Sequence, residues 1–183
     1  MNSSLYGAGA EYGLHSLLIL AGRSDPASVR DLASFQKIPE SFLAKLFTRM
    51  KRAGLVRGLE GISGGFVLAI PAERIRVMDV LAAVDPDRTL FACDEIRRQC
   101  ALYGPEPPEW ATSGRCRIHA FMIEAEQALH AFLGSKTLAD LAGEYVSKAP
   151  NAFIEDTGAW FRQRKTSRTK AKVGRPTASK QQS

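Results

Sequence analysis

Apolar residues recur at helical spacing through the first half of the chain, with short polar breaks between them. Spacings of three to four residues predict helices over residues 11–22, 28–36 and 39–53. Pro39 suits the first turn of the third helix, and Gly54 ends it. Because only a few residues join the second helix to the third, the pattern predicts a helix-turn-helix.

Two short β-branched and aromatic runs follow, at residues 55–57 and 66–68, with four glycines between them. This layout predicts a β-hairpin. A further apolar stripe predicts a helix over residues 72–84. Three helices, a hairpin and a closing helix make a winged helix.

Helical periodicity is lost between residues 86 and 114, where the run 104–108 holds three prolines. It returns over residues 116–133 as a long apolar stripe, which favours a partner helix, most simply that of a second copy in a homodimer. A short helix is predicted over residues 137–145. The predicted fold class is mainly α with a small β-hairpin wing: a winged helix-turn-helix domain plus a long dimerisation helix.

Four segments follow from these patterns. They are a DNA-binding domain over residues 1–85, a cysteine-bearing loop over 86–117, the dimerisation helix and a short helix over 118–148, and a basic, disordered tail over 149–183.

Charge divides unevenly along the chain. Residues 162–183 carry eight Lys or Arg and no acid, which leaves about −2 for the rest of a chain whose net charge is +6. Residues 28–58 add seven basic residues against two acids. A basic patch in a folded region together with a basic tail is typical of a nucleic-acid binder, although a solvated surface gives the same count. With no secretory signal and no long apolar run, we expect a cytoplasmic protein with no membrane partner.

Cys93 and Cys100 lie in the segment without periodicity, and Cys116 lies just after it. An odd number of cysteines in a chain of this kind disfavours a complete disulfide framework and favours metal binding or reactive-thiol chemistry.

Several local strings resemble the Rrf-two family of bacterial winged-helix regulators, the group of IscR, NsrR, RirA and RsrR, and the RsrR type most of all. Together they span about residues 11–133, and the tail lies outside them. The strings are Glu11–His15, Ser41–Phe47, Ala53–Arg57, Gly64–Leu68 and Met78–Asp85.

The resemblance implies a homodimer that binds a pseudo-palindromic double-stranded DNA operator, as a repressor and not an enzyme. It also implies an iron-sulfur cluster, 2Fe-2S in preference to 4Fe-4S, whose state controls DNA affinity in response to redox state, nitric oxide or iron. The cluster-ligand candidates are Cys93, Cys100 and Cys116 with Glu11 and His15, which match family ligands in type and spacing. His119 is a further candidate, since it follows Cys116 at Cys-x-x-His spacing.

The loop departs from the family pattern, because fifteen residues separate Cys100 from Cys116. Two alternatives therefore remain: a cluster-free thiol switch through Cys93 and Cys100, and a zinc-stabilised regulator. A thiol oxidoreductase is disfavoured, because the chain has no Cys-x-x-Cys motif.

The predicted DNA contacts come from the recognition helix, the start of the second helix and the hairpin. They are Ser28, Pro39, Glu40, Ser41, Lys45, Arg49, Arg52, Arg57, Ser63 and Gly64.

Overall fold

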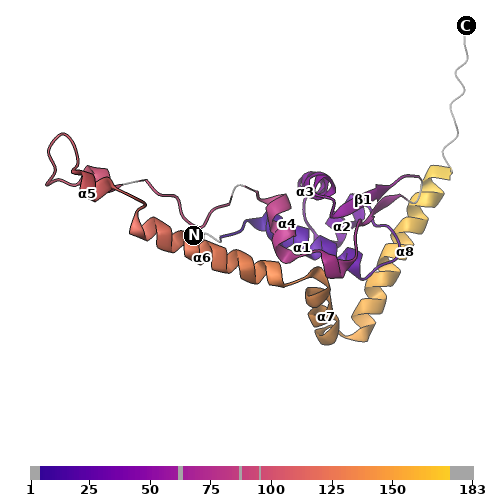
Figure 1. Cartoon of the computed structure of the whole chain (residues 1–183). Helices are drawn as coiled ribbons and strands as arrows, with labels where there is room; N and C mark the ends of the chain where they lie inside the picture. The colour runs from indigo at the N-terminus through magenta and orange to yellow at the C-terminus, as the bar shows by residue number, and fades with distance from the viewer. Residues whose placement is uncertain (1–4, 62–63, 87, 95, 174–183) are drawn as a thin grey trace, which may run out of the picture.

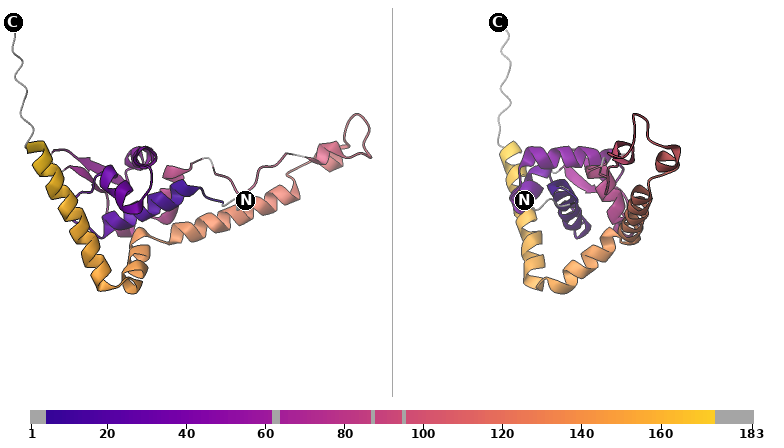
Figure 2. Two further views of the ribbon diagram at one scale, coloured as in Figure 1. Left: turned by 180° about the vertical axis from the view of Figure 1, so that it is seen from behind. Right: turned by 90° about the vertical axis from the view of Figure 1, so that its left-hand side faces the viewer.

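The computed structural model describes residues 5–61, 64–86, 88–94 and 96–173, with side chains to residue 167. A compact winged-helix body carries a long helical arm on one side and a steep C-terminal helix on the other (Figure 1). The turned views in Figure 2 show the same arm and helix leaving the body in different directions. The predicted fold class is confirmed: the body is helical, with one two-stranded hairpin.

Three helices form the helix-turn-helix body: α1 (Ala8–Ala21), α2 (Val29–Gln36) and α3 (Glu40–Arg52). The hydroxyl of Ser28 caps α2 by accepting a hydrogen bond from the backbone N–H of Asp31 at 3.1 Å. Lys37 ends α2 in a left-handed conformation, with φ of 56°. The chain therefore reverses sharply into Pro39, which is the N-cap of α3 and not its first helical residue.

The hairpin consists of β1 (Val56–Leu59) and β2 (Gly65–Leu68), paired antiparallel with Val56 opposite Leu68. Phe66 extends the pairing to Ala27, with backbone hydrogen bonds of 2.8 and 3.0 Å. A Cβ on Gly65 would lie 2.6 Å from the carbonyl oxygen of Ala27, so this approach requires glycine. The pairing fixes the wing against the start of α2.

The helix predicted over residues 72–84 is interrupted. A 3-10 turn, η1 (Ala72–Arg74), is followed by extended backbone at Ile75, and α4 (Val77–Val84) starts after that. The extended residues form hydrogen bonds with a later segment: the N–H of Leu138 donates to the Ile75 carbonyl at 2.8 Å. The prediction of one continuous helix is therefore wrong, because a long-range backbone pairing replaces one helical turn.

The arm consists of α6 (Arg117–Ser135) with η2 (Ile96–Gln99) and the short helix α5 (Glu109–Thr112) near its outer end (Figure 1). The turn α5 follows the proline-rich run and was not predicted. No residue of α6 is buried. The arm therefore exposes most of its length.

Two helices complete the chain: α7 (Leu138–Lys148) and α8 (Asn151–Val173). A reciprocal capping box between Thr137 and Asp140 starts α7, with hydrogen bonds of 2.8 and 3.1 Å. These bonds hold the pKa of Asp140 below its ordinary value. Among the described residues, no helix is long and apolar enough to cross a membrane.

The expectation of a disordered tail from residue 149 is wrong for residues 151–173, because α8 packs on the body. Phe161 is 2% exposed and lies 5.1 Å, ring centre to ring centre, from Phe35 of α2. Trp160 lies 5.2 Å from the same ring. The aromatic pair anchors the helix despite its basic composition.

Candidate DNA interface and cysteine segment

The recognition helix α3 has one buried face and one exposed face. Leu43, Leu46, Phe47 and Met50 are buried in the body. The opposite face exposes polar and basic side chains at the spacing of successive turns. Its exposed predicted contacts are Glu40, Ser41, Lys45, Arg49 and Arg52.

Arg49 has an additional role that its sequence position did not signal. One guanidinium nitrogen donates to the carbonyl oxygen of Val84 at 2.6 Å. Val84 is the last residue of α4, whose final carbonyls have no partner within the helix. Arg49 therefore joins α3 to the end of α4, and this bond competes with the predicted contact of Arg49 with DNA.

The wing and the start of α2 flank α3. Arg57 is exposed on β1, and Ser28 is half-buried with its hydroxyl engaged in the cap of α2. Gly64 is half-buried in the loop that joins the two strands, and Pro39 is exposed at the start of α3. Ser63 lies outside the described residues.

The basic C-terminal helix reaches this side of the body. Arg164 contacts α2 by an ion pair of 3.5 Å to the buried carboxylate of Asp31 and a hydrogen bond of 2.8 Å to Ser34. Lys165 donates to Asp25 at 3.0 Å, which lowers the pKa of that carboxyl below its ordinary value of 3.8. The upper end of α8 lies at the same edge of the molecule as α3 (Figures 1 and 2). The carboxylates of Asp31 and Asp25 therefore offset the repulsion among the basic side chains of α8, which would favour disorder in an isolated tail.

The three cysteines are free thiols on the arm. Cys100 is exposed, while Cys93 and Cys116 are half-buried, and Cys116 is the N-cap of α6. Arg97 donates to the carbonyl of Gly114 at 3.1 Å, which fastens η2 to the chain just before Cys116.

Glu11 and His15 lie on the exposed side of α1 within the body. The outer end of the arm, where α6 begins at Cys116, is remote from α1 (Figure 1). Across the described parts of the chain, no three His, Cys, Asp or Glu side chains come together as a metal-binding group. One protomer therefore does not gather the predicted ligands. His119, the further candidate, contacts the ring of Phe91 at 6.2 Å between centres.

The exposed face of α6 is apolar. Ile118, Phe121 and Phe132 are 63%, 67% and 61% exposed. Exposed aromatic side chains at helical spacing mark a surface that packs against another molecule.

Comparison with known proteins agrees with this architecture. The profile of the Rrf2 family, described as an iron-dependent transcriptional regulator, matches residues 6–144. Protein rrf2 of Nitratidesulfovibrio vulgaris is 34% identical over 134 residues, which are 72% of this chain and 83% of that protein. The transcriptional regulator IscR of Xenorhabdus nematophila is 31% identical over 133 residues, 71% of this chain and 74% of that protein.

Solved structures share the fold. The T. potens IscR structure has a TM-score of 0.60 at 20% identity and covers 85% of this chain and 98% of its own. Staphylococcus aureus CymR has a TM-score of 0.54 at 25% identity, with coverage of 74% and 96%. The family profile and the IscR relative are both named as transcriptional regulators, which is a non-enzymatic role. The chain belongs to the Rrf2 family and is a DNA-binding transcriptional regulator.

Proposed function

We propose that the chain is a repressor that binds a pseudo-palindromic operator as a homodimer, with α3 in the major groove. The observation that carries this proposal is the exposed polar face of α3, which stands beside a wing held by backbone pairing to the start of α2. An α-helix fits the major groove, and side chains on its early exposed face reach base edges.

The exposed side chains divide by chemistry. Lys45 can donate to guanine, while Glu40 can accept from cytosine, and both lie in the early part of α3. Arg52 and Arg57 are cations suited to phosphates, which set orientation without reading sequence. Lys45 is therefore the residue whose loss should change base preference.

Substitution of Lys45 by alanine tests this function. We expect operator affinity to fall by about 1–3 kcal/mol with relaxed preference at one base pair, because a base contact is lost. Fluorescence anisotropy with an operator selected from random DNA measures both quantities. Lys136→Ala is the matched control, since Lys136 is also exposed but lies before α7. Equal affinity and equal base preference for the two variants would contradict the assignment.

The proposed dimer uses the apolar face of α6. Phe121→Glu places a charge on this face, and the variant should be a monomer by sedimentation velocity. Phe153→Glu, on α8 and 48% exposed, is the control and should keep the wild-type mass. A dimer that survives Phe121→Glu would refute the use of this face.

We propose that the sensor is a 2Fe-2S cluster held by Cys93, Cys100 and Cys116 with Glu11 or His15 of a second copy. The donor chemistry fits: three unpaired thiols lie on the arm, and thiolates are the preferred ligands of iron-sulfur clusters. The family description as iron-dependent supports the same reading. Such a cluster supplies one-electron redox chemistry.

A cluster-free thiol switch is the second candidate, favoured by the exposure of Cys100. The solved structures that resemble this chain include an oxidised form of Staphylococcus aureus CymR. Protein purified without oxygen separates the candidates by its visible spectrum and by its iron, sulfide and zinc content. A cluster predicts visible absorption that Cys93→Ala, Cys100→Ala or Cys116→Ala abolishes. Colourless protein in which oxidation links Cys93 to Cys100 would refute the cluster and support the thiol switch. Bound zinc would refute both and support a zinc-stabilised regulator.

A further inference from the structure

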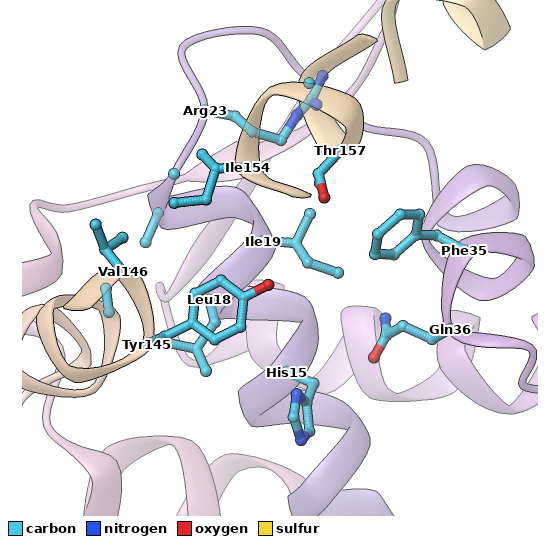
Figure 3. Close-up of a pocket in the computed structure, with 14 residues that line it drawn as sticks. His15, Leu18, Ile19, Arg23, Phe35, Gln36, Tyr145, Val146, Ile154 and Thr157 are labelled. Atoms are coloured by element: carbon cyan, nitrogen blue, oxygen red, sulfur yellow. The ribbon is translucent and has the colours of Figure 1, made fainter. Parts of the chain in front are cut away.

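A cavity of about 350 Å³ lies where α8 crosses the body, between α1, α2, α7 and α8 (Figure 3). Ile154, Thr157 and Gly158 of α8 form one side of it. These residues lie beyond residue 144, where the match to the family profile ends. The cavity therefore depends on a helix that is specific to this chain relative to that profile.

The walls of the cavity are mostly apolar. Leu18 and Ile19 of α1 face Val146 and Ile154 across the space, while Arg23 and His15 lie at opposite ends (Figure 3). Ligand pockets of small molecules have this composition, and they begin at about 300 Å³.

Two of the polar side chains around the cavity already have partners. The side-chain amide of Gln36 donates to Ser16 Oγ at 2.8 Å and to the Leu32 carbonyl at 3.3 Å. The hydroxyl of Thr157 donates to the carbonyl of Phe153 at 2.8 Å. These groups hold the wall together and offer little to a ligand.

Arg23 differs from them. Its Nε is buried and has no hydrogen-bond partner among the described residues. The guanidinium carbon lies 4.3 Å from the centre of the Phe161 ring. Burial lowers the pKa of Arg23, which the neighbouring charge of Asp25 only partly opposes. Arg23 is the one lysine or arginine among the described residues that line the cavity, and its charge would attract an anionic head group at this end.

We propose that this cavity binds an amphipathic carboxylate, with its apolar chain along the walls and its carboxylate accepting a hydrogen bond from Arg23. A saturated acid of about ten carbons matches a cavity of this size. Charge selects the class: Arg23 is a cation, and no Asp or Glu is among the described residues that line the cavity. A neutral or cationic amphiphile would lack this attraction to Arg23.

The site would act on DNA binding through α2, a consequence that rests on the proposed function. Phe35 and Gln36, the last residues of α2, line the cavity, and Gln36 joins α2 to α1 through Ser16. An occupant that moves this end of α2 also moves the turn into α3. Ligand binding is measurable on the protein alone, so its failure is distinct from a failure to bind DNA.

Titration of the full-length protein with decanoate, decanol and decylamine tests the proposal, by calorimetry and by the fluorescence of Trp160, which contacts Phe35. Wild-type protein should bind decanoate at least tenfold more tightly than either other probe. Arg23→Gln should remove this preference by weakening decanoate at least tenfold. Arg30→Gln, an exposed arginine of α2 outside the cavity, should leave it unchanged.

A second variant distinguishes binding in the cavity from binding to other apolar surfaces. Ala142 lines the space from α7, and Ala142→Phe should weaken all three probes alike while thermal unfolding confirms a folded protein. The proposal is overturned if decanoate does not bind, if it binds no better than decylamine, or if Arg23→Gln and Arg30→Gln behave alike. Decanoate binding that appears only after deletion of residues 174–183 also overturns the proposal, because these residues would then be the occupant of the cavity in the full-length protein.

Discussion

Replacement of Phe161 by alanine should weaken the attachment of α8 to the body. The side chain is 2% exposed, and its ring centre lies 5.1 Å from Phe35 and 4.9 Å from Trp160. Burial of a phenylalanine contributes about 1.5–3 kcal/mol, and each favourable ring pair adds about 0.5–1.5 kcal/mol. Since the ion pairs of α8 remain, we expect a loss of about 3 kcal/mol, at the lower end of measured Phe→Ala costs.

Phe153→Ala is the matched control, because Phe153 lies on the same helix but is 48% exposed. Its cost should stay below about 1 kcal/mol. Urea unfolding followed by Trp fluorescence gives the free energy of unfolding for each variant, and limited proteolysis reports release of α8. If the two variants lose equal stability, or if α8 stays protected in Phe161→Ala, then Phe161 does not anchor the helix.

Three further outcomes are expected. Gly65→Ala should disrupt the wing and lower stability by more than 1 kcal/mol, whereas Gly104→Ala, with no atom within 4 Å of an added Cβ, should change thermal unfolding little. Lys165→Gln should raise the pKa of Asp25 towards 3.8 in a carboxyl NMR titration. In the wild-type protein the ion pair contributes its full stability above about pH 3.8, and this contribution is lost as the pH falls through the lowered pKa of the folded state. Deleting residues 174–183, with two basic residues, should reduce the slope of log affinity against log salt by up to ~1.8 for all DNA sequences if the tail contacts phosphates, and an unchanged slope would exclude those contacts.

Much of the body could be predicted because its determinants are local. The apolar stripe of α3 and the cap at Ser28 lie within one or two helical turns of the backbone they stabilise. The glycines near Gly65 likewise signalled the hairpin before its register was known. Short sequence strings such as Ser41–Phe47 and Gly64–Leu68 are local in the same sense, and they indicated the family.

The candidate site was predicted unevenly for a related reason. Residue type and spacing singled out Cys93, Cys100 and Cys116, since thiolate chemistry is a property of the side chain itself. Spacing also placed Glu11 and His15 one turn apart on α1, as observed. Whether these two groups meet depends on a second copy, and the ligand set remains a prediction.

The sequence alone determined the helix-turn-helix, the wing, the long apolar helix and the chemistry of the cysteine segment, because each depends on neighbours in the chain. Tertiary structure alone decided the break at Ile75, the bond from Arg49 to Val84, and the docking of α8 against Phe35. Each of these joins residues at least 35 positions apart, so no local pattern encodes the partner. For α8 the physical reason is sharpest: a basic helix repels itself in isolation, and only the acids and aromatic rings of the folded body make its ordered state favourable.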